Sequence, residues 1–136
     1  MMGREAMASQ EMVNEALGDD AEDMARPPYA NVPREHALWP AIAAAIREVY
    51  DPEIPVNLYE LGLIYTVEID DDNNIYVQMS LTAPGCPVAG EMPGMVEDAV
   101  RTVDGIGEKV EVELIWDPPW NPTMMAETAK LQLNMF

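Results

Sequence analysis

Residues 63–81 read LIYTVEIDDDNNIYVQMSL, and the rest of the expected architecture is arranged around them. Apolar and polar side chains alternate on both sides of a polar centre, which predicts two strands that each bury one face. The centre, DDDNN at 70–74, consists of residues that favour turns, so the stretch is expected to form a β-hairpin. The side chains expected on the buried faces are Leu63, Tyr65, Val67 and Ile69 in the first strand, and Ile75, Val77, Met79 and Leu81 in the second.

Helical periodicity flanks the hairpin on both sides. Before it, Leu38, Ile42, Ile46 and Val49 predict an amphipathic helix over about 37–49 that ends at Asp51-Pro52. After it, apolar residues from Val88 to Val103 predict a second helix. Pro93 lies inside that pattern, and we favour a helix that starts at Pro87 and is kinked. The alternative is a helix that starts near Met92, which would make Cys86 a loop residue away from the helix dipole.

A third strand and a last helix complete the pattern. Val110, Val112, Leu114 and Trp116 alternate, and the strand is expected to stop at the sequence WDPPW, residues 116–120. Asn121 can then cap a helix that begins at Pro122 and runs to about Leu133.

These elements predict an α+β fold of two layers in the order α-β-β-α-β-α. A helix connects the second and third strands, so these two should be parallel, in a small three-stranded mixed sheet with helices on one face. This domain is expected to span 31–136. Residues 1–30 contain seven of the 25 acidic residues and few large apolar ones, which predicts a mostly disordered acidic tail.

The charge of the chain narrows the classes of partner. Seven Lys and Arg stand against 25 Asp and Glu in 136 residues, a net charge of −18. Such a surface repels phosphate backbones and anionic lipids, which argues against nucleic acid and membranes as partners. An acidic face could steer a basic protein partner or attract cations, and the alternative is that the acidity only keeps the protein soluble. No apolar stretch is long enough to cross a bilayer, and acidic residues interrupt the N-terminal region, so we expect a cytoplasmic protein. A single cysteine excludes an intramolecular disulfide.

The one thiol, Cys86, lies in LTAPGCPVAG at 81–90. Thr82 is expected to end the second strand, Gly85 permits a sharp turn, and Pro87 suits a first helical position. Cys86 would then be the N-cap residue, where backbone N–H groups and the helix dipole stabilise a thiolate. The alternative is an inert, buried cysteine. One thiol cannot hold an iron–sulfur cluster alone, so a second subunit, a partner or a small thiol would have to complete the ligands.

Two further groups are candidates. Asp51 and Glu53 follow a helix C-terminus, where they could bind a metal, orient the thiol, or accept backbone hydrogen bonds in the turn. Trp116 and Trp120 in WDPPW could cover the edge of the core or form a partner-docking surface. The methionines of the last helix leave the same two possibilities open: Met124, Met125 and Met135.

Three separated motifs carry a family resemblance. They are YDPEIPVNLYELGLIY at 50–65, MSLTAPGCP at 79–87 and VELIWDPPWNPTMM at 112–125. In this order they resemble the SufT-like members of the metal–sulfur cluster biosynthetic domain family, which also contains the phenylacetate-pathway protein PaaD. The resemblance covers about residues 36–136, and the acidic tail has no part in it.

The resemblance implies an accessory factor of the SUF system that helps to deliver or insert iron–sulfur clusters into client proteins, rather than an enzyme. It implies that Cys86 is a functional thiol and the ligand of a transient cluster or iron, with Asp51, Glu53 and Thr82 around it. The implied partners are SUF assembly proteins and apo iron–sulfur clients, and a cluster shared by two Cys86 thiols would favour a homodimer. Two alternatives remain: a thiol-independent adaptor that binds clients through Trp116 and Trp120, and a PaaD-like component of an aromatic-degradation oxygenase system.

Overall fold

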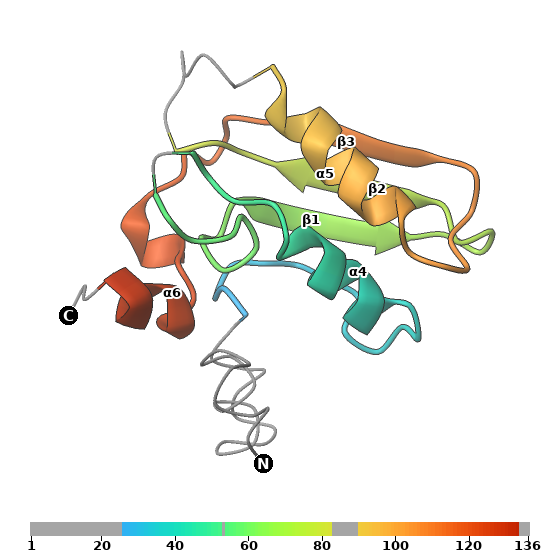
Figure 1. Ribbon diagram of the computed structural model, residues 1–136, viewed down its shortest axis with the longest axis horizontal. Coiled ribbons are helices and arrows are strands. Elements are labelled where there is room, and N and C mark those ends of the chain that lie inside the picture. The colour runs from blue at the N-terminus through green and yellow to red at the C-terminus, as the bar shows by residue number, and fades with distance from the viewer. Residues whose placement is uncertain (1–25, 53, 83–89, 134–136) are drawn as a thin grey trace, which may run out of the picture.

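The computed structural model describes residues 26–52, 54–82 and 90–133. The predicted alternation of helices and strands is present in this part of the chain (Figure 1). The elements are α4 (Trp39–Ile46), β1 (Ile64–Ile69), β2 (Ile75–Met79), α5 (Met92–Arg101), β3 (Val110–Leu114), the short 3₁₀ helix η1 (Pro122–Met124) and α6 (Glu127–Leu133).

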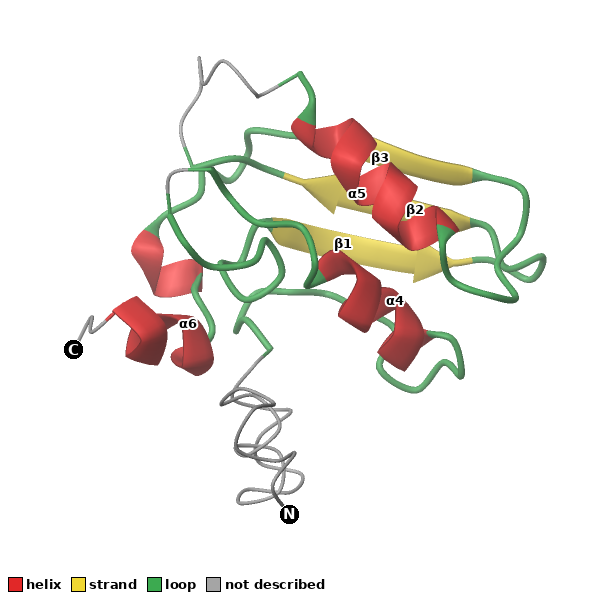
Figure 2. Cartoon of the chain, viewed as in Figure 1, coloured by secondary structure: helices red, strands yellow, loops and turns green. Residues whose placement is uncertain are grey.

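The three strands form one mixed sheet in the order β1-β2-β3. β1 and β2 are antiparallel and joined by the hairpin, whereas β2 and β3 are parallel and joined through α5. Helices α4 and α5 lie together on one face of the sheet (Figure 2). The predicted fold class is therefore confirmed.

The core lies between this helical layer and the sheet. Ile42 and Ile46 of α4, and Val96 and Val100 of α5, are fully buried. The second strand buries the residues that its alternation predicts, because Ile75, Val77 and Met79 are at most 2% exposed. At the edge of the core, the ring of Trp39 meets that of Tyr59 edge to face, with 5.8 Å between centroids.

The predicted alternation of the first strand is wrong at Tyr65. Ile64 pairs with Met79 and Thr66 pairs with Gln78, so Tyr65 is an extra residue in β1 that no residue of β2 opposes. Such a bulge shifts the face on which the following side chains lie. As a result Ile64 is buried beside Val67, while Tyr65 is only half-buried.

Helix boundaries also differ from the prediction. α4 is shorter than 37–49 at both ends. α5 starts at Met92, so the predicted kinked helix from Pro87 is wrong, and its N-cap position is held by Glu91 rather than by Cys86. The physical reason is that Pro93 then falls in the first turn, where the missing N–H of proline leaves no helical hydrogen bond unmade.

The C-terminal segment forms two helices instead of the single predicted one. Asn121 caps η1 as expected, with its side-chain oxygen accepting from the backbone N–H of Thr123 at 2.9 Å. Met125 is then extended, and α6 begins two residues later. Met124 and Met125 are buried, so both belong to the protein interior. Met135 lies outside the described residues.

Candidate functional site

Two of the four predicted site positions can be placed: Thr82 follows the end of β2, and Asp51 lies in the loop between α4 and β1. The other two, Glu53 and Cys86, lie outside the described residues. The end of β2, after which Thr82 follows, lies at the end of the sheet opposite the hairpin turn, and α6 lies near the same end (Figure 1).

A series of backbone hydrogen bonds connects the two motif segments. The N–H of Ser80, just past β2, donates to Leu63 O at 2.8 Å. The N–H of Leu63 donates to Leu58 O at 3.2 Å, and that of Leu58 donates to Val49 O at 2.8 Å. Ser80 precedes Thr82 by two residues, as Val49 precedes Asp51, so the backbone holds both motif segments against one central loop.

Asp51 is a structural residue of its turn. Its side chain is 7% exposed, and its Oδ1 accepts a hydrogen bond from the N–H of Ile54 at 2.9 Å. Its own N–H donates to Val56 O at 3.3 Å. Of the three roles that the sequence left open for Asp51, backbone hydrogen bonding within the turn is thus observed. Thr82 is half-buried.

The two tryptophans of WDPPW have different surroundings. Trp120 packs against the core, and its indole N–H donates to Leu61 O at 2.8 Å. Trp116, which was predicted to lie in the third strand, follows the end of β3 and is 42% exposed. Trp120 therefore covers the core edge, and only Trp116 has the exposure that docking requires.

A buried carboxylate that sequence reasoning missed connects the loop before β1 to α6. Glu60 is 2% exposed, and its carboxylate accepts from the hydroxyl of Thr128 and lies 3.4 Å from Arg47 Nε. Its backbone oxygen accepts from the N–H of Ala126 at 2.8 Å. The sequence did contain a signal for this residue, because Glu60 is the one acid inside the apolar run VNLYELGLI at 56–64. An acid that is buried with such a run is rarely left without a partner.

The pKa of the hydroxyl group of Tyr65, the bulge residue, is shifted. Burial raises its pKa above the ordinary value, and the hydroxyl of Ser80 acts in the opposite direction to a smaller extent. The Tyr65 hydroxyl donates to Pro118 O at 2.7 Å, which ties the WDPPW turn to the start of β1.

Two features are absent from the part of the chain that the structure describes. Within 26–52, 54–82 and 90–133, no group of three or more His, Cys, Asp and Glu side chains is arranged to hold a metal ion. In the same part of the chain, none of the helices has the length and apolar character that spanning a bilayer requires.

Comparison with known proteins shows the family to which this chain is similar. The pattern of the family described as iron–sulfur cluster assembly protein matches residues 40–114. An Fe–S protein maturation auxiliary factor from Porphyromonas gingivalis is 47% identical over 93 residues, which cover 68% of this chain and 88% of the relative. The Fe–S protein maturation auxiliary factor SufT from Staphylococcus aureus is 36% identical over 87 residues, which cover 64% of this chain and 98% of the relative.

A solved structure supports the same assignment at the level of the fold. A domain of unknown function, DUF59, from Bacillus anthracis superposes with a TM-score of 0.64 at 35% identity, over 70% of this chain and 90% of that one. The predicted resemblance to SufT-like proteins is confirmed, and the chain belongs to the iron–sulfur cluster assembly protein family.

Proposed function

We propose that this protein is an accessory factor in the maturation of iron–sulfur proteins, which helps to deliver or insert clusters into clients. The observation that carries the proposal is the family match over residues 40–114, which takes in the whole sheet and helix α5. The relatives named Fe–S protein maturation auxiliary factors are matched over 88% and 98% of their own lengths, so the likeness covers nearly the whole of each relative.

Cys86 is the group that we assign to the cluster. Thiolates are the protein ligands that iron–sulfur clusters prefer, and this chain has one cysteine. The cluster is cargo, and the remaining ligands come from a second copy of the chain, from a partner or from a small thiol. Because α5 starts at Met92, the activation of Cys86 does not rest on the N-terminus of that helix.

In this proposal the residues assigned around the thiol act through the backbone. Asp51 fixes its turn by accepting from the N–H of Ile54, and the backbone hydrogen bonds from Ser80 to Leu63 and onward anchor the strand end from which the Cys86 segment departs. We assign positioning roles to Asp51, Glu53 and Thr82, and no catalytic residue. A single cysteine leaves no second thiol in the chain to resolve a mixed disulfide, which favours a carrier or scaffold over a redox enzyme.

The partners in this proposal are SUF assembly proteins and apo iron–sulfur clients in the cytoplasm, and a cluster bridging two Cys86 thiols gives a homodimer. The relatives reported above are named for iron–sulfur protein maturation, which favours this role over a PaaD-like role in an oxygenase system.

Anaerobic reconstitution with iron and sulfide tests the assignment of Cys86. Wild-type protein is expected to gain visible absorbance and protein-bound iron, and Cys86→Ser is expected to lose both. Met95→Ala is the matched control, because it removes a different sulfur from a side chain that is 44% exposed on the helix after the Cys86 segment. Equal iron and absorbance in wild type and Cys86→Ser would reject Cys86 as a ligand.

The exposure of Trp116 supports a second candidate function, a thiol-independent adaptor. In that case Trp116→Ala removes the binding of apo clients and Cys86→Ala leaves it intact. Under the leading proposal, Cys86→Ala abolishes cluster binding whatever Trp116→Ala does. Trp120 is unsuitable for this comparison, because its hydrogen bond to Leu61 O makes its replacement a test of folding.

A further inference from the structure

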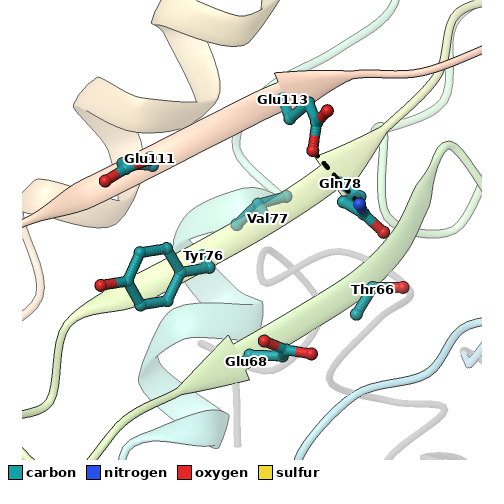
Figure 3. A pocket seen from close by; sticks show the side chains of 7 residues that line it. All are labelled: Thr66, Glu68, Tyr76, Val77, Gln78, Glu111 and Glu113. Carbon is teal, nitrogen blue, oxygen red and sulfur yellow. Dashed lines mark hydrogen bonds between the residues drawn. The ribbon is translucent and has the colours of Figure 1, made fainter.

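The face of the sheet opposite α4 and α5 is a second surface of interest. Its side chains project away from the helical layer, and in the described part of the chain no helix covers them (Figure 3). The residues that line the hollow drawn there come from all three strands. Except for Val77, whose side chain is buried in the core, their side chains lie on this face: Thr66, Glu68, Tyr76, Gln78, Glu111 and Glu113.

Three adjoining hollows make this face a continuous groove. The central one, of about 240 Å³, shares Thr66 and Gln78 with a hollow of about 510 Å³ that extends to Pro118. On the other side it shares Glu68 and Tyr76 with a hollow of about 440 Å³ that reaches the hairpin turn. We call the three together the sheet groove. It follows β1, whose six residues span about 20 Å, so it matches the length of about six extended residues.

The sheet groove is lined by acids and by no basic side chain. Five carboxylates line its three hollows, and none of the lining residues is Lys, Arg or His. The acids are Glu68, Asp70, Glu111, Glu113 and Asp117. Aromatic rings lie among them, including Tyr76 and the 66% exposed Tyr29, and such rings attract cations over their faces.

We propose that the sheet groove binds an extended, basic segment of a partner protein. The charge of the groove selects this occupant, since opposite potentials favour encounter and like potentials oppose it. Residues 1–25 contain seven acids and one arginine, and a second copy of the chain has a net charge of −18, so both carry the wrong sign. None of the described residues that line the groove is one to which the proposed cluster chemistry is assigned, so this inference goes beyond that proposal.

A charge-reversal comparison tests the proposal. The probe is a short fluorescent peptide in which lysine alternates with valine, titrated against the full chain and followed by fluorescence anisotropy. Glu111→Lys with Glu113→Lys reverses two charges in the groove. The matched control, Glu48→Lys with Asp104→Lys, makes the same change in net charge between α4 and α5 on the helical side. We expect the groove variant to weaken binding by about tenfold and the control by less than about twofold.

Further measurements keep the outcome interpretable. Circular dichroism establishes that each variant is folded, and the gentler pair Glu111→Gln with Glu113→Gln is expected to weaken binding by about threefold. Equal weakening by the groove and control variants would mean that the peptide senses only net charge, and the proposal would fail. It would also fail if peptide-induced amide shifts fell in residues 1–25 instead of β1, β2 and β3. Peptide binding by Cys86→Ser should equal that of wild type, so this result and the cluster experiment can fail separately.

Discussion

Replacement of Glu60 is the sharpest test of how the C-terminal segment is held. The carboxylate accepts from the hydroxyl of Thr128, from Asn57 Nδ2 at 3.3 Å and from Gln132 Nε2 at 3.4 Å, and lies beside Arg47. Two of these partners are on α6 and two belong to segments before β1. Removal of one carboxylate therefore weakens the attachment of α6 to the rest of the domain.

The size of the effect follows from burial. Glu60→Ala leaves Asn57 and Thr128 buried without their acceptor, and each buried group left unpaired costs about 1–3 kcal/mol. Arg47 Nε, which faces the carboxylate, is buried, although the side chain as a whole is 28% exposed. The expected loss in free energy of unfolding is about 3–5 kcal/mol for Glu60→Ala. Glu60→Gln keeps an acceptor for Thr128 and the packing volume, so its loss should be about 1–2 kcal/mol.

Urea unfolding followed by circular dichroism measures both values. Glu127→Ala is the control, since Glu127 is on α6 as well, pairs with Lys130 at 3.7 Å and is 56% exposed, and an exposed pair contributes about 0–1 kcal/mol. Hydrogen exchange should show that Glu60→Ala loses protection in α6 before it does so in β2. If Glu60→Ala cost no more than Glu127→Ala, the buried network would not be what holds α6.

Three other predictions concern single residues. Gly62→Ala should lower the free energy of unfolding by at least about 2 kcal/mol, because φ is +85° there and a Cβ would lie 2.2 Å from Met124 O. A Cβ at Gly94 in α5 meets nothing within 4 Å, so Gly94→Ala should be neutral or stabilising in thermal unfolding. The raised pKa of Tyr65 means that its contribution to stability is present below pH 10.0 and is lost as the pH rises through the folded pKa. An ultraviolet titration of wild type minus Tyr65→Phe should show a phenolate whose midpoint of formation lies above pH 10.0. Hydrogen bonds, first that from the backbone N–H of Asn74, lower the pKa of Asp70 below 3.8. The contribution of Asp70 to stability is therefore present above pH 3.8 and is lost as the pH falls through the folded pKa. A carboxyl NMR titration that gave a midpoint at or above 3.8 would contradict this.

The order of elements could be predicted because local patterns agree with the final packing. In β2 the alternation of Ile75, Val77 and Met79 matches burial residue by residue. The parallel arrangement of β2 and β3 follows from the single helix between them, since a connection that crosses the sheet returns in the same direction.

The errors occur where a local pattern admits two structures. The bulge at Tyr65 depends on pairing with β2, and the sequence alternates equally well without it. The start of α5 depended on whether Pro93 lies inside the helix or in its first turn, and the energetic cost of an internal proline selects the latter.

The site was predictable in part. The turn role of Asp51 was one of the three alternatives that the sequence left open, and the hydrogen bond from the N–H of Ile54 shows that Asp51 performs it. The division between Trp116 and Trp120 required the fold, because only the position of Leu61 O shows that Trp120 is held inward. The role of Glu60 could not be predicted, because its partners on α6 are far from it in the sequence. Thr128, for example, is 68 residues away.

Activation of an apo iron–sulfur enzyme tests whether Cys86 takes part in cluster delivery. The client, iron, sulfide and thiol are mixed without oxygen, and the rate of regained activity is measured with wild-type protein, with Cys86→Ser and with no addition. Wild type should accelerate activation above the rate without addition, Met95→Ala should match wild type, and Cys86→Ser should give the rate without addition. Acceleration by Cys86→Ser equal to that by wild type would contradict the assignment of cluster delivery to this thiol.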